Sequence, residues 1–374
     1  MTTVGAPTLP PHVARTILQP EPRQPRVVVI VPAHNEAKQI GDTLRSLDAQ
    51  TRPPDSVLVV SDNSTDATVH LAATTLPHRG VAVIETVGNE AKKSGALNAG
   101  IRALAASGRT FDYLVTTDAD STLGPDFIET AVAVMEADPG LGGLSGVYRA
   151  KAEIETRTPW GRYLVAMQRL EAARARGTRT GAYVHTMSGA AAVYRGAAVD
   201  HVIADRGALF DERPSNLVED YETTLTLKRL GWRCTANHLC ATFTDLMPTT
   251  RELLAQQTRW TRGTIDELRR HGWRRYTARS IATLATGFGA SLVMLALVAY
   301  LAVNVTASPR DWLVTAGFSL ITPAFSAWFA RSAGPRSMLL AVAAVPAIVY
   351  TGLRLWWLWS SLYRSLFTPS PEAW

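Results

Sequence analysis

The sequence predicts an α/β domain with a mainly parallel sheet, followed by C-terminal transmembrane helices. From Arg26 onward, short apolar segments alternate with segments of helical pattern, which is typical of βαβ units. After Arg279, charged residues are almost absent from long apolar runs. Charged residues make up 19% of the 374 residues, whereas soluble domains contain about 25%. We therefore expect part of the chain to lie in lipid.

The alternating region predicts four strands with helices between them. The predicted strands are Val27–Val31, Ser56–Val60, Val81–Glu85 and Tyr113–Thr117. The predicted helices are Gln39–Ala49, Thr65–Thr75 and Ala96–Ala106. In open sheets of this type, ligands bind beyond the carboxyl ends of the strands. The residues expected to meet there are Pro32–Glu36, Asp62 and Asp118–Asp120.

The middle of the chain predicts an amphipathic helix and two further strands. Thr156–Gly177 carries apolar residues at helical spacing, with arginines on the other side. The apolar residues are Trp160, Tyr163, Leu164, Met167 and Leu170. The further predicted elements are a helix over Asp220–Arg229 and strands over Val184–Tyr194 and Cys234–Phe243. Cys234 and Cys240 lack the spacing of a zinc site or a disulfide framework, so we expect two buried thiols.

Three apolar runs follow, each with about the 20 residues that a membrane-spanning helix needs. The runs are Ile281–Val305, Trp312–Ala330 and Ser337–Tyr363. Arginines precede the first run and lie between the last two, and the positive-inside rule predicts that both positions are cytosolic. A buried soluble helical domain is the alternative. Arg354 interrupts the third run, where it either lines a polar path or, beside three tryptophans, lies at the membrane interface.

These patterns divide the chain into four parts. They are a proline-rich arm over residues 1–25, the α/β domain over 26–250, amphipathic interface helices over 251–280 and a membrane domain over 281–374. The arm has no apolar core of signal-peptide length, so we expect a multi-pass protein of the cell (inner) membrane with a cytosolic α/β domain. The net charge of +6 is concentrated before the apolar runs, which favours an anionic lipid bilayer over nucleic acid as partner.

Two groups of charged residues have the chemistry of a nucleotide site. Asp118 and Asp120 end a predicted strand one residue apart, so both carboxylates can face one cation. Carboxylate and diphosphate oxygens suit Mg²⁺ or Mn²⁺, although acidic residues are also common in turns. Lys92 and Lys93 precede a glycine-containing helix start, which offers backbone amides and a cation to phosphate. A solvated lysine pair is the alternative there.

Later residues have the chemistry of a transfer reaction. Glu219 and Asp220 open a predicted helix, where a carboxylate either caps the helix or accepts a proton from an attacking hydroxyl. Gln256, Arg259 and Trp260 share one face of the next helix. An arginine can neutralise a leaving diphosphate, and a tryptophan can stack on a sugar ring. Trp260 has the alternative role of a membrane anchor.

Seven motifs occur in a fixed order along this chain. They are VPAHNE (Val31–Glu36), SDNSTD (Ser61–Asp66), KKSGALNAG (Lys92–Gly100), TDAD (Thr117–Asp120), MSGA (Met187–Ala190), VED (Val218–Asp220) and QQTRW (Gln256–Trp260). This series resembles the processive family 2 glycosyltransferases, which include cellulose, hyaluronan, chitin and poly-N-acetylglucosamine synthases. The resemblance covers Val27–Gly263 and, in kind, the membrane helices. It implies a nucleotide-sugar-binding domain of GT-A type.

The resemblance also implies roles for individual residues. The UDP-sugar donor would be bound by Pro32, Ala33, Glu36, Asp62, Lys93, Asp118 and Arg259. The saccharide acceptor would be bound by Ser188, Gly189, Gln256 and Trp260. The metal would be held by Asp120 and Asp118, and the catalytic carboxylates would be Asp220, the base, and Glu219 beside it.

The expected function is therefore that of a membrane-bound inverting glycosyltransferase that extends a β-linked polysaccharide or oligosaccharide. UDP-N-acetylglucosamine is the favoured donor and UDP-glucose the next. Ser61, Asn63 and Val218 differ from the usual family residues, and we expect no counterpart of the transmembrane helix that many relatives carry before this domain. A non-processive transferase that adds one sugar to a lipid or protein acceptor is thus the alternative. An inactive membrane receptor or scaffold is a third possibility, which donor hydrolysis would exclude.

Overall fold

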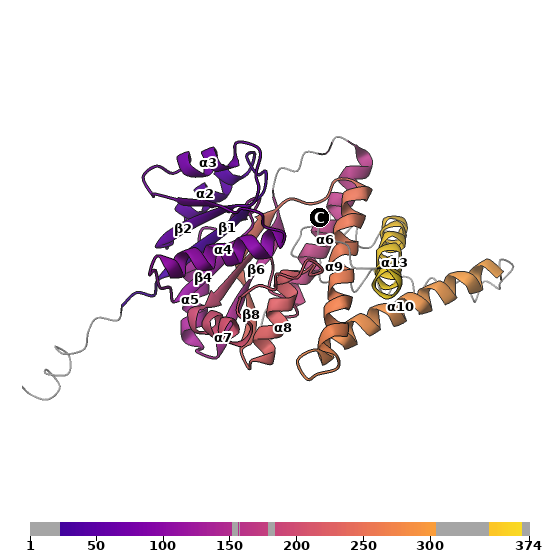
Figure 1. The fold of residues 1–374 in the computed structure, drawn as a ribbon. Coiled ribbons are helices and arrows are strands. Elements are labelled where there is room, and N and C mark those ends of the chain that lie inside the picture. Colours follow the sequence, from indigo (N-terminus) through magenta and orange to yellow (C-terminus); the bar gives the residue numbers. More distant parts are fainter. Residues whose placement is uncertain (1–22, 152–155, 157, 179–183, 304–343, 369–374) are drawn as a thin grey trace, which may run out of the picture.

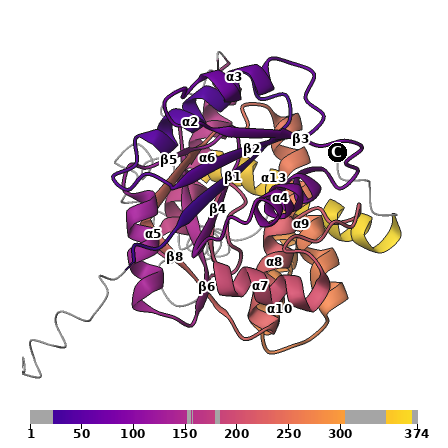
Figure 2. The ribbon, with the colours of Figure 1, turned by 60° about the vertical axis from the view of Figure 1, so that its left-hand side comes forward.

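A computed structural model describes residues 23–151, 156, 158–178, 184–303 and 344–368. In Figures 1 and 2, a sheet with helices packed on it forms one body, and α9 (Thr250–His271), α10 (Ala278–Val303) and α13 (Ala344–Phe367) lie together at one side of it. Nearly all of the predicted proline-rich arm and the whole predicted span Trp312–Ala330 lie outside the described residues.

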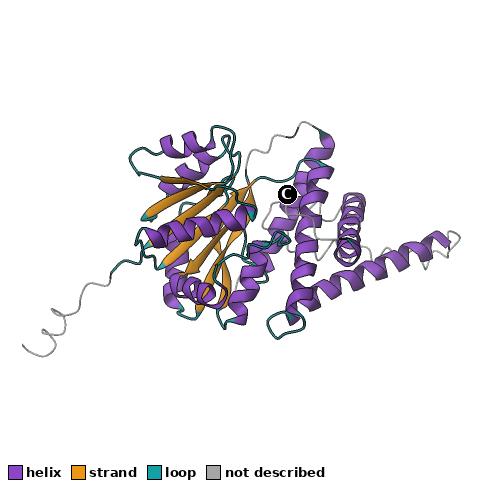
Figure 3. Cartoon of the chain, in the orientation of Figure 1, coloured by secondary structure: helices purple, strands orange, loops and turns teal. Residues whose placement is uncertain are grey.

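An eight-stranded sheet, in the order β3-β2-β1-β4-β7-β6-β8-β5, forms the centre of the domain (Figure 3). Four of its neighbouring pairs are parallel, namely β1–β2, β1–β4, β2–β3 and β6–β8, and the other pairs are antiparallel. The mainly parallel sheet that the sequence predicts is therefore confirmed. The strands are β1 (Val27–Ala33), β2 (Ser56–Ser61), β3 (Ala82–Glu85), β4 (Tyr113–Thr117), β5 (Thr122–Leu123), β6 (Leu141–Ala150), β7 (Ala191–Arg195) and β8 (Arg233–Thr244).

Helices cover both faces of the sheet. In β1, Val27, Val29 and Val31 belong to one apolar cluster with α2 and α5, whereas Val28 and Ile30 belong to another with α4 and α7. A strand that is buried on both faces needs a continuous apolar run, which explains the unbroken valines and isoleucine of β1. The remaining helices are α2 (Ile40–Asp48), α3 (Thr68–Thr74), α4 (Lys92–Ala106), α5 (Phe127–Ala137), α6 (Pro159–Thr178), α7 (Gly196–Arg206) and α8 (Glu219–Arg229).

The structure differs from the sequence prediction at several places, and the sequence did not predict α5, α7 or β5. Helix α4 begins at Lys92 rather than Ala96, so the lysine pair is part of the helix. The predicted strand Val184–Tyr194 is wrong in its first part, because β7 begins at Ala191. Strand β6 was not predicted, since its glycines hide the apolar pattern. They are required by packing, because a Cβ at Gly143 would lie 2.3 Å from the sulfur of Met187.

Two of the three predicted membrane spans fall partly on described helices. Most of Ile281–Val305 lies in α10 and part of Ser337–Tyr363 lies in α13. Helix α13 buries Tyr350 and Trp357 in an apolar cluster with α6 and α9, so one of its faces packs on protein. Within the described residues, none of the helices has the length and apolar character needed to cross a bilayer. The predicted transmembrane helices are therefore not confirmed.

Candidate active site

A cavity of about 730 Å³ lies at the carboxyl ends of β1, β2 and β4, between the sheet and helices α6, α8 and α9. It is lined by every residue that the sequence predicts for the donor, the acceptor, the metal and the base. These residues come from positions 32 to 260 of the chain. The structure therefore brings the predicted residues together in one place, and their individual roles stay predictions.

The Asp62 carboxylate is held in place at the end of β2. Its Oδ1 accepts hydrogen bonds from Thr86 Oγ1 at 2.7 Å, Asn89 Nδ2 at 2.9 Å and Asn63 Nδ2 at 3.0 Å. Asn89 belongs to no predicted motif, yet it explains why position 95 is a glycine. A Cβ at Gly95 would lie 1.9 Å from Asn89 Oδ1. The glycine of KKSGALNAG is thus needed for the close approach of Asn89.

Three carboxyl groups form an acidic cluster beside Asp62. Burial, and then the nearby Asp120 and Asp118, raise the pKa of Glu36 to about 7. Burial also raises the pKa of Asp118 to about 6, against the opposing effect of Lys93. Carboxyl groups that raise one another's pKa lack sufficient positive charge around them. Because carboxylate oxygens are good ligands for hard divalent cations, this cluster fits such an ion.

Lys93 connects the two halves of the cavity. Its ammonium lies 2.6 Å from Asp118 Oδ1 and 2.8 Å from Glu219 Oε1, and it donates to the carbonyl of Gly189 at 3.3 Å. Although burial opposes it, Lys93 holds the pKa of Glu219 below its ordinary value. Glu219 is therefore an ionised partner of Lys93, which leaves its neighbour Asp220 as the carboxylate available for proton transfer.

The Asp220 carboxylate is oriented by two backbone amides. Gly189 N donates to Oδ2 at 2.9 Å, and Tyr221 N donates to Oδ1 at 2.7 Å. Burial, and then Glu219, raise the pKa of Asp220 to about 6. A Cβ at Gly189 would lie 3.2 Å from both Asp220 Oδ2 and Lys93 Nζ. The glycine therefore keeps open the space between a carboxylate and an ammonium group.

Helix α9 supplies the wall opposite Asp220. Gln256, Arg259 and Trp260 all line the cavity, as their shared helix face predicts. Arg259 Nη1 donates to the carbonyl of Leu217 at 3.2 Å, and the Trp260 side chain is 43% exposed. The tryptophan thus presents an accessible apolar surface next to a charged group.

Another wall of the cavity is formed by residues that belong to none of the seven motifs, among them Gln168 and Glu171. The sequence analysis did not predict them. The side chain of Gln168 on α6 donates to the carbonyl of Met247 at 2.8 Å and accepts from the amide of Met247 at 3.1 Å. Glu171 of α6 accepts from Tyr350 Oη at 2.8 Å and lies 3.6 Å from Arg354 Nη1. Arg354 of α13 therefore reaches the wall of the cavity through Glu171. No sequence signal pairs these residues, because the contact joins helices that are far apart in the chain.

A second group of titratable residues lies outside the cavity. Oxygen and nitrogen atoms of Glu222, Glu267 and His271 lie within 4.8 Å of one another. Burial lowers the pKa of His271 to about 4, so its ring is neutral at neutral pH. The Arg270 guanidinium, however, lies 3.1 Å from Glu222 Oε1 and 3.0 Å from Glu267 Oε2. Because arginine already neutralises both carboxylates, this group does not fit a metal ion.

Comparisons with known proteins identify relatives of the chain. The family described as "Glycosyltransferase like family 2" matches residues 25–263. An N-acetylglucosaminyltransferase of Mesorhizobium japonicum is 29% identical over 347 residues, which cover 87% of this chain and 78% of that protein. Another N-acetylglucosaminyltransferase, from Bradyrhizobium diazoefficiens, is 30% identical over 253 residues, which cover 65% of this chain and 50% of that protein.

One solved structure resembles nearly the whole chain. It is a mannosyltransferase from Pyrobaculum calidifontis in complex with GDP-Man and Mn²⁺, with a TM-score of 0.63 and 21% sequence identity. The similarity covers 95% of this chain and 93% of the mannosyltransferase. At this identity the likeness concerns the fold, and it supports the predicted GT-A-like architecture.

Proposed function

Since the chain belongs to the glycosyltransferase-like family 2, we propose that it is an inverting glycosyltransferase that transfers N-acetylglucosamine from UDP-N-acetylglucosamine to a saccharide hydroxyl. The observation that carries the proposal is the placement of Asp220 and Lys93 beside Gly189, because Asp220 Oδ2 and Lys93 Nζ would each lie 3.2 Å from a Cβ at that position. A proton acceptor and a phosphate-binding cation thus lie close together in the wall of one cavity. A displacement at a sugar carbon needs that arrangement.

The proposed reaction is a single displacement. The acceptor hydroxyl attacks the anomeric carbon while its proton passes to Asp220, whose Oδ atoms are oriented by two amides. The bond between the anomeric carbon and the phosphate oxygen breaks, and the nucleoside diphosphate leaves with the electron pair. With one base and no covalent nucleophile, an α-linked donor gives a β-linked product.

Positive charge around the diphosphate stabilises the leaving group. We propose that Lys93 and Arg259, both in the wall of the cavity, bind the diphosphate oxygens. A divalent cation, Mg²⁺ or Mn²⁺, held by Asp118 and Asp120 would add charge neutralisation there. The acidic cluster with Glu36 supports such an ion, and the similar mannosyltransferase was determined with Mn²⁺.

The proposed donor rests on two relatives, since both curated proteins of 29% and 30% identity are N-acetylglucosaminyltransferases. The test is to incubate the purified protein with UDP-N-acetylglucosamine, UDP-glucose and GDP-mannose in turn, with Mn²⁺, and to measure the nucleoside diphosphate released and the product mass. We expect release from UDP-N-acetylglucosamine above all. Release from GDP-mannose alone would contradict the proposed donor, and no release from any donor would contradict the transferase function.

We also propose that the enzyme works at a membrane and extends a β-linked chain. Large apolar side chains are exposed on both C-terminal helices, among them Val293 and Leu292 on α10 and Trp356 on α13. The sequence motif QQTRW supports chain extension, because it resembles the motif of processive synthases. Contact of α13 with Glu171 would hold the acceptor wall close to the lipid surface.

The replacement Trp260→Ala tests chain extension. If Trp260 stacks on the acceptor sugar, its loss removes about 1 to 3 kcal/mol of contact, so dissociation between additions is expected to be roughly ten to a hundred times faster. Products should therefore become shorter, while initial donor consumption falls less. Chain length and membrane recovery are measured on one preparation. Poor membrane recovery with unchanged product length would identify Trp260 as a membrane anchor instead.

The raised pKa of Asp220 predicts the pH dependence of transfer. The folded-state pKa of about 6 means that the carboxylate is mostly ionised, and able to accept a proton, at neutral pH. Transfer at saturating donor is therefore expected to fall as pH decreases through about 6. Donor binding, measured separately by equilibrium titration, isolates this effect from protonation of Asp118 and Glu36. Undiminished transfer at about pH 5 would contradict the assignment of the base.

A further inference from the structure

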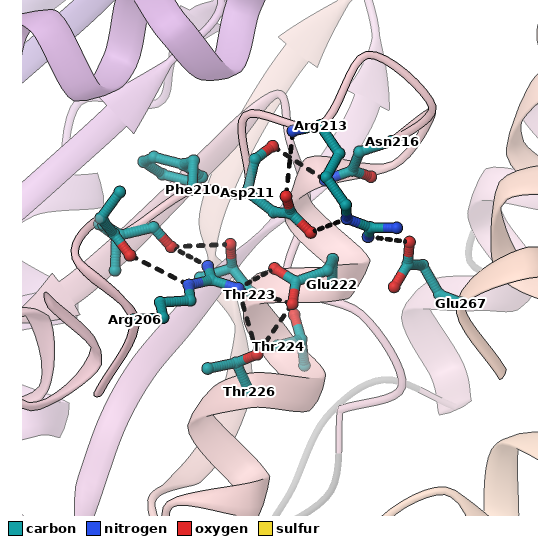
Figure 4. Close-up of polar contacts among 12 residues, drawn as sticks. Arg206, Phe210, Asp211, Arg213, Asn216, Glu222, Thr223, Thr224, Thr226 and Glu267 are labelled. Carbon is teal, nitrogen blue, oxygen red and sulfur yellow. Dashed lines mark hydrogen bonds and ion pairs between the residues drawn. The ribbon is translucent and has the colours of Figure 1, made fainter. Parts of the chain in front are cut away.

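A network of ion pairs outside the cavity joins the end of α7, the loop between α7 and α8, and helices α8 and α9. Figure 4 shows Arg206 directed at Glu222 and Arg213 directed at Glu267. We call this network the α8–α9 clasp. Its members are the carboxylates of Asp211, Glu222 and Glu267 and the guanidinium groups of Arg206, Arg213 and Arg270.

Each carboxylate of the clasp has two arginine partners. Arg206 Nη1 lies 2.6 Å from both oxygens of Glu222. Glu267 accepts from Arg213 Nη2 at 2.7 Å and from Arg270 Nε at 3.0 Å. The side chains of Glu222 and Glu267 are 1% and 4% exposed. Buried charges depend strongly on their partners, because an unpaired charge has lost its hydration.

The clasp lies next to the residues that carry the proposed chemistry. Leu217 and Val218 directly precede Glu219 and Asp220 in the chain. The carbonyl of Leu217 accepts from Arg259 of α9, and a Cβ on α9 at Gly263 would lie 2.8 Å from Val218. Helix α9 is therefore packed tightly on the segment that leads into the base.

The loop of the clasp is also joined to the helix that bears Lys93. Asn98 of α4 donates to the carbonyl of Phe210 at 2.7 Å and accepts from its amide at 3.1 Å. Phe210 directly precedes Asp211, a member of the clasp. The helices with Lys93, Asp220 and Arg259 thus meet at one loop, although they are separate in sequence.

We propose that Glu267 is a positioning residue, which holds α9 against this loop and so sets the place of Arg259 relative to Asp220. This proposal rests on the proposed glycosyltransferase function. Glu267 touches neither the cavity nor, in the proposed reaction, any substrate. Its effect passes through Arg213 on the loop and Arg270 on its own helix. Misplacement of a reacting group by about 1 Å can lower a rate by about a hundredfold.

The experiment is the replacement Glu267→Gln in the full chain, which keeps the size of the side chain and removes its charge. We expect kcat to fall by roughly tenfold to a hundredfold. Donor KM should rise much less, because Arg259 is only one of the groups proposed to bind the donor, and Asp62 and Asn89 lie outside the clasp. The matched control is Asp205→Asn, which breaks the pair between Asp205 of α7 and Arg229 at the other end of α8. It is expected to leave kcat unchanged.

A second measurement separates positioning from a general loss of structure. If Glu267 acts by placing Arg259, then Glu267→Gln should lower kcat much less in an Arg259→Ala background than in the wild type. Equal losses in both backgrounds, or an unchanged kcat per folded molecule, would overturn the proposal. Should Glu267→Gln fail to fold, Arg213→Gln is used, which removes the charge that pairs with Glu267 at a side chain that is 36% exposed; a normal kcat there also overturns the proposal.

Failure of this proposal differs from failure of the proposed function. A wild-type protein that releases no nucleoside diphosphate from any donor contradicts the function itself. A wild type that turns over, together with Glu267→Gln at full kcat, contradicts only the positioning role.

Discussion

Replacement of Asp220 by asparagine is expected to lower sugar transfer by about two to four orders of magnitude, the usual contribution of a general base. Asparagine has nearly the same shape, and its one oxygen can still accept from the amide of either Gly189 or Tyr221, which donate to different oxygens of Asp220. Donor binding should therefore persist, because the nucleotide end of the cavity is built around Asp62. Transfer is measured in a single turnover, and donor affinity by equilibrium titration on the same protein.

The alternative for Asp220 is that it only stabilises the start of α8. The N-cap residue of α8, Val218, makes no side-chain capping bond, and Asp220 follows in the first turn. The matched control is Asp42→Asn, which removes a carboxylate from the first turn of α2, outside the cavity. A first-turn carboxylate contributes about 0.3 to 1 kcal/mol of stability. If Asp220→Asn behaves like this control, with normal transfer per folded molecule, the base assignment is wrong.

Replacement of Asp120 by asparagine is expected to remove most activity, by at least about a hundredfold. Metal-assisted neutralisation of a transition state contributes several kcal/mol, and each 1.4 kcal/mol corresponds to about a factor of ten in rate. The structure supports a cation at this position, because burial and then Asp120 raise the pKa of Glu36, and a bound cation would offset that excess of negative charge.

The metal is tested directly by chelation. Wild-type transfer should stop in excess chelator and return when Mn²⁺ or Mg²⁺ is added in excess. Asp120→Asn should need more Mn²⁺ for its residual activity, because one ligand carboxylate has become a neutral amide. Full turnover of the wild type in excess chelator would contradict a metal requirement, even if Asp120→Asn were inactive.

The hydrophobic pattern of the sequence was sufficient to predict most of the first half of the fold. Strands that are buried on both faces, such as β1, are continuous apolar runs, and the turns between them carry polar residues. The pattern failed at β6, whose glycines are required by close contact with side chains from other elements, such as Met187 against Gly143. It also failed before β7, where Ser188 and Gly189 form a turn at the cavity instead of a strand.

The sequence also predicted which residues meet, because motifs that follow parallel strands must converge at one edge of a sheet. It did not predict how they pair. Glu219 and Asp220 are adjacent and chemically alike, yet Lys93 pairs with Glu219, while two amides orient Asp220. That division of roles depends on the distance between α4 and α8, which no local pattern contains.

By itself, then, the sequence determined the α/β architecture and the motif residues of the cavity, because apolar periodicity and strand-end motifs are local properties of the chain. The tertiary structure decided the contacts between distant segments. These are the pairing of Lys93, the wall that Glu171 forms with α13, and the joining of α8 to α9 through Glu267. The physical reason is that burial, pKa and charge pairing depend on neighbours in space, and those neighbours exist only once the chain has folded.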